Sequence, residues 1–185
     1  FGAYGNPEDC RGGGILCQSS SPLILNNLIA DNNASGYGGG LYFYSSQATL
    51  LHNTVINNTA GESGGGLAGY YSPLTITDSI FWGNSGGQVN FWNSAGRTVS
   101  HCNTMSSVHP GTGNISADPL FVTGPDGDAY LSNIGAGDPA NSPCLDAGSD
   151  LAVNLCYAAG SEQVCMNRRT TRSDSVPDTS TVDMG

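Results

Sequence analysis

Residues 38–67, GGGLYFYSSQATLLHNTVINNTAGESGGGL, contain one complete unit of a repeat and the start of the next unit. A triple glycine followed by Ile or Leu also occurs at residues 12–15, so this element recurs at spacings of 26 and 26. Downstream of the triple glycines come β-type runs at 22–32, 48–58 and 73–84, in which apolar and polar residues alternate. Alternation with a period of two is typical of a strand with one buried face. Because only Gly, Ser and Asn turns separate these strands, the sequence predicts coils stacked directly on one another, a β-solenoid.

Equivalent side chains of stacked coils lie about 4.8 Å apart, so they form columns. Aligning the runs places four side chains in one column, which we expect to form a hydrogen-bonded ladder: Asn27, Asn53, Asp78 and Asn103. The same alignment places His52 over Asn26, and we expect His52 to face solvent. The triple glycines suit corners where φ is positive or where another backbone comes close.

The length, charge and amino-acid composition of the chain exclude several classes of protein. The chain has 185 residues, enough for one domain, and only 11% of them are charged, which excludes a charged helical bundle or coiled coil. Its net charge is −10 and it contains no Lys, so nucleic acid and anionic membranes are poor partners. No apolar run approaches the roughly 18 residues of a membrane span. The chain begins at Phe1 without a charged and apolar leader, and we expect it to be a mature or trimmed product.

The six cysteines show no spacing typical of a zinc site. Disulfides in an oxidising compartment fit them best, which predicts an extracellular or cell-surface location. Proximity in sequence suggests three pairs, Cys10 with Cys17, Cys156 with Cys165 and Cys102 with Cys144. Six cysteines nevertheless allow 15 connectivities, so this map is one of several.

The glycine elements are paired with an apolar-x-x-Asn element at residues 29–32, 55–58 and 81–84. This combination resembles the right-handed parallel β-helix repeats of bacterial surface proteins. The polymorphic outer-membrane proteins, whose repeats carry GGA[ILV] and FxxN, are the most similar in pattern, although only FWGN at 81–84 matches the second motif literally. The resemblance covers roughly residues 12–104, and residues 117–148 are similar to the closing segment of many such proteins. It implies an all-β fold, a short right-handed parallel β-helix of about four coils of 22–26 residues, and no particular activity, because the family mixes adhesins, passenger domains and polysaccharide-degrading enzymes.

Two other repeat folds fit less well. Leucine-rich repeats share this period, but the segment that would be convex is Gly/Ser/Asn with no helical pattern, and a propeller needs longer units. We therefore expect four parts of the chain: an N-terminal arm or cap at 1–11, the β-helix coils at 12–104, an irregular disulfide-fastened region at 105–167 and an extended tail at 168–185.

The ends of the solenoid suggest self-association. The tail has almost no large apolar residue, so it is most readily ordered by pairing with a sheet edge, its own or a neighbour's. A short stack must also hide the edges at its two ends. Head-to-tail contact of this kind yields filaments when its rotation does not close.

No catalytic residues are predicted. Arg97 is the only basic side chain except histidine between residues 12 and 167, and it reads as a solvated turn residue. Asp31 and Glu62 fall in turns, so the repeats offer no paired carboxylates of the kind a glycosidase needs. The three His share no ligand spacing and support no Ser/His/Asp arrangement.

Three aromatic side chains fall at matching outward positions of successive coils: Tyr44, Tyr70 and Trp92, with Tyr42 and Tyr71 nearby. Such a column can stack sugar rings, which makes it the predicted glycan-binding site. The alternative is that it packs against a loop or a second subunit.

Acidic residues gather after residue 117, and the predicted metal ligands are Asp118, Asp126 and Asp128, with Asp138, Asp146 and Asp150 in the same group. Calcium is the only cofactor this group suggests, since Ca²⁺ prefers several carboxylate and carbonyl oxygens. The alternative is that these aspartates belong to ordinary turns, which need no metal. Three sequons are candidate glycosylation sites: Asn33, Asn57 and Asn114.

Together these features predict an extracellular, non-enzymatic structural or surface protein that self-assembles, with adhesion and glycosylation as further expectations. Its predicted partners are other copies of itself and glycans. The alternative is a carbohydrate-active β-helix, either a fragment of a polysaccharide lyase or hydrolase or a glycan-binding module.

Overall fold

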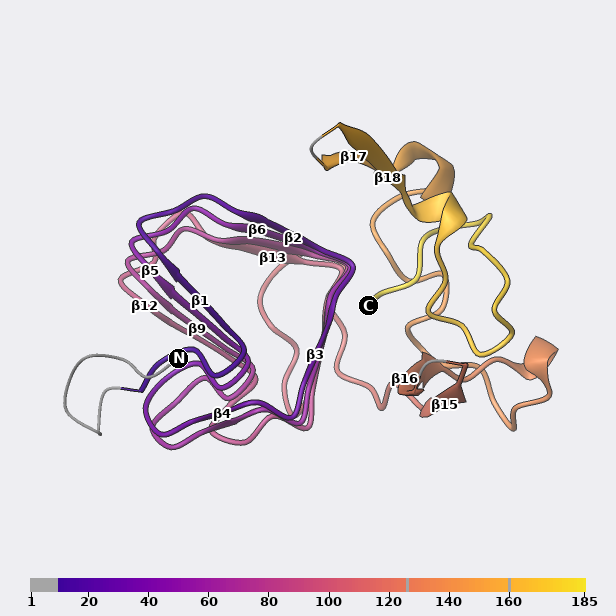
Figure 1. Cartoon of the computed structure of the whole chain (residues 1–185). Coiled ribbons are helices and arrows are strands. Elements are labelled where there is room, and N and C mark those ends of the chain that lie inside the picture. Colours follow the sequence, from indigo (N-terminus) through magenta and orange to yellow (C-terminus); the bar gives the residue numbers. More distant parts are fainter. Residues whose placement is uncertain (1–9, 126, 160) are drawn as a thin grey trace.

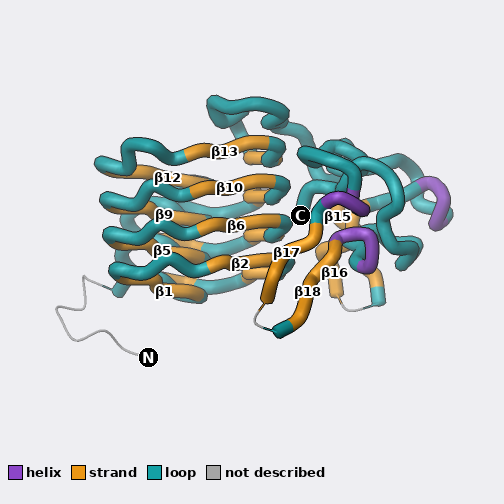
Figure 2. Tube along the Cα trace, turned by 90° about the horizontal axis from the view of Figure 1, so that it is seen from above, coloured by secondary structure: helices purple, strands orange, loops and turns teal. Residues whose placement is uncertain are grey.

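The computed structural model describes residues 10–125, 127–159 and 161–185, and up to residue 104 these wind into a stack of coils (Figures 1 and 2). Three four-stranded parallel sheets run along the stack. Sheet A contains β1 (Ile15–Gln18), β5 (Leu41–Tyr44), β9 (Leu67–Tyr70) and β12 (Val89–Trp92). Sheet B contains β2 (Leu23–Leu25), β6 (Thr49–Leu51), β10 (Thr75–Thr77) and β13 (Thr98–Ser100). Sheet C contains β3 (Leu28–Ala30), β7 (Thr54–Ile56), β11 (Ile80–Trp82) and β14 (Asn103–Thr104).

This arrangement confirms the predicted all-β parallel β-helix. A short parallel pair, β4 (Asn33–Ala34) with β8 (Thr59–Ala60), follows sheet C in the first two coils. The predicted N-terminal arm lies outside the described residues except for Cys10 and Arg11.

The interior of the stack is filled by inward side chains from all three sheets. Phe43 of sheet A, Leu50 of sheet B and Val55 of sheet C are all fully buried in one core cluster. Burial of apolar area is the main stabilising contribution to such a stack, roughly 1.5–3 kcal/mol for each large side chain.

The triple glycines lie at corners where φ is positive and where another backbone comes close, as expected. The first glycine of each triplet has a positive φ, 68° at Gly12, 69° at Gly38 and 69° at Gly64. The second lies against the backbone of the next coil, since a Cβ on Gly39 would be 2.6 Å from the carbonyl oxygen of Gly65. Backbones of successive coils therefore touch at these corners, where a side chain has no room.

The predicted Asn column is right for Asn27 and Asn53 and wrong for Asp78 and Asn103. Thr77 pairs with Leu51, so Ser79 follows Asn53 in the ladder, and the backbone N–H of Asn53 donates to Ser79 Oγ at 3.1 Å. Asn103 is the partner of Ile80 instead. The period stays at 26 through this corner, so matching Asp78 to Asn53 by residue type shifted the alignment by one position.

Asp78 instead lies in the column of His52, at a corner where both residues have positive φ, 52° and 51°. The expectation that His52 faces solvent is wrong, because only 2% of the residue is exposed. The C-terminal region covers this corner, with Tyr157 and Ser149 in contact with the two side chains.

A second ladder joins the asparagines of the apolar-x-x-Asn element. The backbone and side-chain N–H groups of Asn32 donate to Asn58 Oδ1, and those of Asn58 donate to Asn84 Oδ1, all at 2.9–3.0 Å. Gln88 accepts from Asn84 at the end of the ladder, where the repeat shortens. Each buried amide thereby links three coils.

Beyond residue 104 the chain first crosses the last coil, where the N–H of His101 donates to Thr112 and Asn103 bridges Ile115. Its described residues then form two antiparallel hairpins and three short 3-10 helices: β15 (Phe121–Gly124), β16 (Gly127–Leu131), η2 (Ile134–Ala136), η3 (Ala152–Asn154), β17 (Cys156–Ala159), β18 (Glu162–Cys165) and η4 (Met166–Arg168). None of the helices in the described residues is long and apolar enough to cross a membrane.

This C-terminal region packs beside sheet C (Figure 1). Ile80 of sheet C shares a buried cluster with Leu131, Cys144 and Met184. The tail, expected to need a sheet edge, is held by its own chain, since Thr181 bridges Leu151 and the N–H of Gly185 donates to the carbonyl of Asp78.

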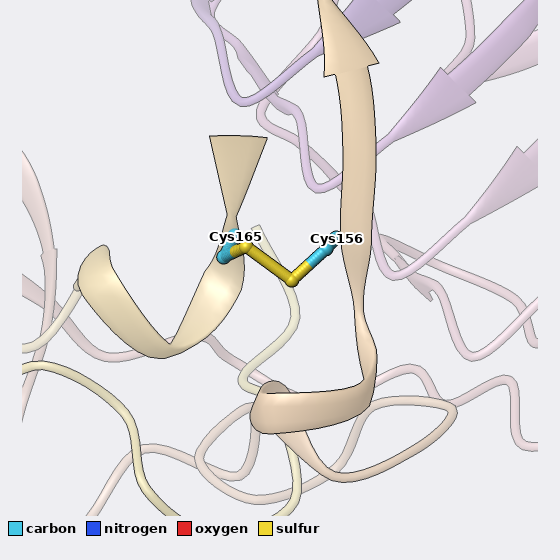
Figure 3. The surroundings of a disulfide bond; sticks show 2 residues. All are labelled: Cys156 and Cys165. Carbon is cyan, nitrogen blue, oxygen red and sulfur yellow. A yellow bond between two sulfur atoms is a disulfide. The ribbon is translucent and has the colours of Figure 1, made fainter. Parts of the chain in front are cut away.

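Only one of the three expected disulfides is present. Cys156 and Cys165 are bonded across the β17–β18 hairpin (Figure 3), as predicted. The other four cysteines are free: Cys10, Cys17, Cys102 and Cys144.

The two remaining pairings are wrong because the partners belong to different environments. Cys102 is buried in the interior of the solenoid, whereas Cys144 is buried in the cluster outside sheet C. Cys17 packs against the solenoid interior, whereas Cys10 is exposed.

Thiol labelling checks this map. Burial raises the pKa of Cys102 to about 12 and that of Cys144 to about 11, so neither forms a reactive thiolate at pH 8. We expect a disulfide reagent to modify Cys10 in the folded protein and to reach Cys102 and Cys144 only in denaturant. Peptide mapping without reduction should recover the 156–165 link; a 102–144 link in the folded protein would contradict the arrangement.

Candidate functional site

The outer face of sheet A carries the aromatic column expected from the sequence. Because side chains alternate across a strand, Leu41 and Phe43 point inward while Tyr42 and Tyr44 point outward. Tyr44 is the strand partner of Tyr70, which is the partner of Trp92 in the next coil. The structure thus brings the three predicted side chains together in register.

The rings of this face form two groups in contact, Tyr44 with Tyr70 and Tyr71, and Trp92 with Tyr37. Tyr44 and Tyr70 are stacked, with ring centroids 5.9 Å apart and planes inclined by 6°. Tyr71 meets the edge of Tyr70 at 4.5 Å. Trp92 meets Tyr37 edge to face at 5.6 Å. Such contacts add roughly 0.5–1.5 kcal/mol each to the area that the rings bury, so they hold the ring planes in fixed orientations.

A cavity of about 490 Å³ opens on this face, lined by Arg11, Tyr37, Tyr42, Tyr44, Tyr70 and Trp92. The guanidinium of Arg11 lies 5.5 Å from the centroid of the Tyr42 ring and 6.0 Å from that of Tyr37. Sequence reasoning missed Arg11 and Tyr37. Tyr37 directly precedes the second triple glycine, and this position was the available signal.

The chemistry of the cavity lining suits binding. Its lining supplies flat apolar rings, phenol hydroxyls, an indole N–H and a guanidinium, which are groups that stack on and hydrogen-bond to sugars. Among the described residues that line it there is no carboxylate or imidazole to act as a general acid or base.

His52 and Asp78 form a second polar cluster, where the solenoid meets the C-terminal region. His52 Nε2 lies 3.7 Å from Asp78 Oδ2 and 3.3 Å from the hydroxyl of Tyr157, and the hydroxyl of Ser149 donates to Asp78 Oδ2 at 2.7 Å. Burial lowers the pKa of His52 to about 4 and raises the pKa of Asp78. His52 is 2% exposed and Asp78 is fully buried, and their contacts with Tyr157 and Ser149 fasten the C-terminal region to the solenoid.

The predicted calcium site at Asp118, Asp126 and Asp128 stays a prediction, because only two of its three residues are described. Asp118 is exposed and accepts from the N–H of Leu120 in a turn, and Asp128 is exposed and accepts from the hydroxyl of Thr123. Asp126 lies outside the described residues. In the described ranges, the group of side chains close enough to share a cation is a different one, Asp146 with Asp178 and Asp183.

The three sequons differ in accessibility. Asn33 and Asn57 are exposed at the corner after sheet C, so both can carry a glycan. Asn114 is half-buried, and its amide nitrogen already donates to the carbonyls of Val99 and His109 at 2.9 Å. Glycosylation stays a prediction at all three positions.

Comparison with known proteins identifies the architecture. A family model described as a right handed beta helix region matches residues 6–105, which is more than half of the 185-residue chain. No curated protein and no solved structure is significantly similar to the chain. The chain therefore belongs to the right-handed β-helix family.

Proposed function

We propose that this protein is a non-catalytic, extracellular β-helix that binds polysaccharide along the outer face of sheet A. The observation that carries the proposal is the cavity on the outer face of sheet A, formed by Tyr42, Tyr44, Tyr70 and Trp92 of that sheet together with Arg11 and Tyr37 beside it. Successive rungs are about 4.8 Å apart, so the column from Tyr44 through Tyr70 to Trp92 spans about 10 Å. That spacing suits neighbouring sugar rings of one extended chain.

The chemistry of the lining supports a glycan over other ligands. Sugars present flat C–H faces to aromatic rings and hydroxyls around their edges, and this face offers rings together with donors from Arg11 and the tyrosines. The net charge of −10 disfavours heavily sulfated chains, so a neutral or weakly acidic polysaccharide is the expected ligand class. The resemblance of the repeats to those of polymorphic outer-membrane proteins supports a location at a cell surface.

Binding should be tested first on an array of neutral, uronic-acid and sulfated polysaccharides, followed by calorimetry with the best binder. We expect Trp92→Ala to weaken the binding of that polysaccharide about ten- to thirtyfold, because an aromatic anchor contributes roughly 1.4–2 kcal/mol. Heparin should not bind.

The second tryptophan provides a matched control. Trp82 is also half-buried at the end of a strand, but in sheet C. Trp82→Ala should leave glycan affinity unchanged within twofold. In Trp82→Phe the emission of Trp92 alone reports binding, and it should shift when polysaccharide is added. The proposal would be overturned if no polysaccharide on the array bound the protein, or if both alanine variants lost the same amount of affinity.

Self-association through the first coil is a second candidate. Its strands β1, β2 and β3 each have one parallel neighbour among the described residues, and three outward leucines of these strands are 44–54% exposed: Leu16, Leu23 and Leu28. The opposite end is crossed by residues 105–115, and the tail is held by its own chain, so a partner would meet the first coil. Light scattering that shows only monomer at high concentration would rule assembly out.

A further inference from the structure

Three carboxylates meet where the tail crosses the segment after Cys144. Asp146 belongs to that segment, and Asp178 and Asp183 belong to the tail. One oxygen from each carboxylate lies within 4.8 Å of the others. Asp178 is 3% exposed and Asp183 is 4% exposed, so two of the three charges are withdrawn from water.

The hydrogen bonds of the cluster leave one buried oxygen without a partner. Asp183 Oδ1 accepts from the N–H of Asp146 at 2.8 Å, but Asp183 Oδ2 is fully buried and has no hydrogen-bond partner in the described structure. Ser180 is the only hydroxyl that the described hydrogen bonds give to the cluster, and its oxygen lies within reach of both Asp146 Oδ1 and Asp178 Oδ1. A hydroxyl has one proton, so it donates to one of these carboxylates at a time.

Within the described ranges no ion pair involves any of the three carboxylates. The guanidinium of Arg172 is paired with Asp174 at 3.4 Å, and its charge acts on Asp183 only from a distance. A buried carboxylate is tolerated when it is protonated, paired with a cation or bound to a metal.

We propose that Asp146, Asp178 and Asp183 form a calcium site that fastens the C-terminal tail to the segment after Cys144. Ca²⁺ takes oxygen ligands at 2.3–2.6 Å, so two ligands on opposite sides of the ion are at most about 5.2 Å apart. The separation of 4.8 Å or less in this cluster fits a shared ion. The unpartnered Asp183 Oδ2 would become a ligand, and water would complete the six to eight oxygens that calcium needs.

The site favours calcium over magnesium. Mg²⁺ requires near-ideal octahedral geometry at 2.0–2.1 Å and keeps most of its water, whereas Ca²⁺ accepts irregular sets of carboxylates from separate segments. Only two short segments of the chain supply this cluster, and one of them is the tail that reaches the His52–Asp78 corner through Gly185. Calcium would therefore hold the C-terminal region against the solenoid, independently of any glycan on sheet A.

The test uses the full chain, stripped with EDTA and then titrated with CaCl₂ by calorimetry. We expect one site with a Kd of about 10⁻⁴ M, the range of extracellular calcium modules. At a calcium concentration 100-fold above Kd, Tm should rise by about 5–10 °C, and MgCl₂ at the same concentration should raise it much less. Absence of both binding heat and a Tm shift in 10 mM CaCl₂ would overturn the proposal.

Two variants locate the site. Asp183→Asn removes a ligand charge at nearly constant shape, and it should abolish the calcium-dependent rise in Tm. Asp31→Asn removes one charge from an exposed corner of the solenoid that already has a positive φ of 58°, and it should respond to calcium as the natural chain does. If the response survives in Asp183→Asn and disappears in Asp128→Asn, calcium binds at the β15–β16 turn and the assignment made here is wrong. Calorimetry on the natural chain decides the question even if Asp183→Asn fails to fold.

Discussion

Asn58→Ala is expected to lower the free energy of unfolding by about 4 kcal/mol. The Asn58 side chain is fully buried and makes five hydrogen bonds: two to the N–H groups of Asn32, two to the carbonyls of Ile29 and Ile56, and one to Asn84 Oδ1. Alanine removes all five and leaves the N–H of Asn32 and the carbonyl of Ile29 to find other partners in a place with little water. Since whole domains are stable by only about 5–15 kcal/mol, urea unfolding should show a large fall in midpoint.

Asn32→Ala is the matched control, because Asn32 ends the same ladder and is only half-buried. Its side chain makes two hydrogen bonds, to the carbonyl of Ala30 and to Asn58 Oδ1. We expect a cost of about 1 kcal/mol. Equal losses from the two variants, or a loss below about 1 kcal/mol for Asn58→Ala, would show that the ladder does not hold the coils together.

The second large effect is expected from Gly65→Ala, which should cost about 3 kcal/mol. A Cβ on Gly65 would lie 2.0 Å from the carbonyl oxygen of Ser85 and 3.0 Å from that of Asn58. Both atoms are backbone, so relief requires two coils to separate at a corner where they share hydrogen bonds. Urea unfolding with an unchanged m-value would attribute the loss to the native state.

Gly96→Ala separates this clash from the cost of a positive φ. Gly96 has a φ of 83°, and the nearest atom to its Cβ would be 3.8 Å away on Pro73. Alanine at Gly96 is therefore strained without a clash and should cost about 1 kcal/mol. If Gly65→Ala costs no more than Gly96→Ala, close contact between coils is not what requires glycine at position 65.

The fold was predictable because its determinants repeat. The glycine triplets and the strands between them fix the period, and the alternation in each run fixes which side chains are buried, as at Phe43 and Tyr44. The aromatic column was predictable for the same reason, since register follows from period. The alignment failed at Asp78, because Asp resembles Asn in chemistry while the backbone places Ser79 in that position.

What could not be predicted lies where the period ends. The acidic cluster joins residues 37 positions apart in the chain through the packing of an irregular tail, and no spacing in the sequence marks it. The same holds for His52, whose burial depends on the C-terminal region and not on its own coil. Proximity in sequence also misled the cysteine pairing, because Cys102 points into the solenoid interior while the adjacent Asn103 contacts Cys144 outside sheet C.

The C-terminal region lies against the solenoid on the side of sheet C, away from sheet A (Figure 1). Duplication of a coil would therefore lengthen the sheet A surface by one rung, about 4.8 Å, without changing the contacts on the sheet C side. If sheet A binds polysaccharide as proposed, a longer homologue built in this way would hold a longer stretch of the polymer and release it more slowly, since each added rung brings another point of attachment. The addition of coils would then change the residence time of a bound polymer without changing the contacts by which the C-terminal region stabilises the fold.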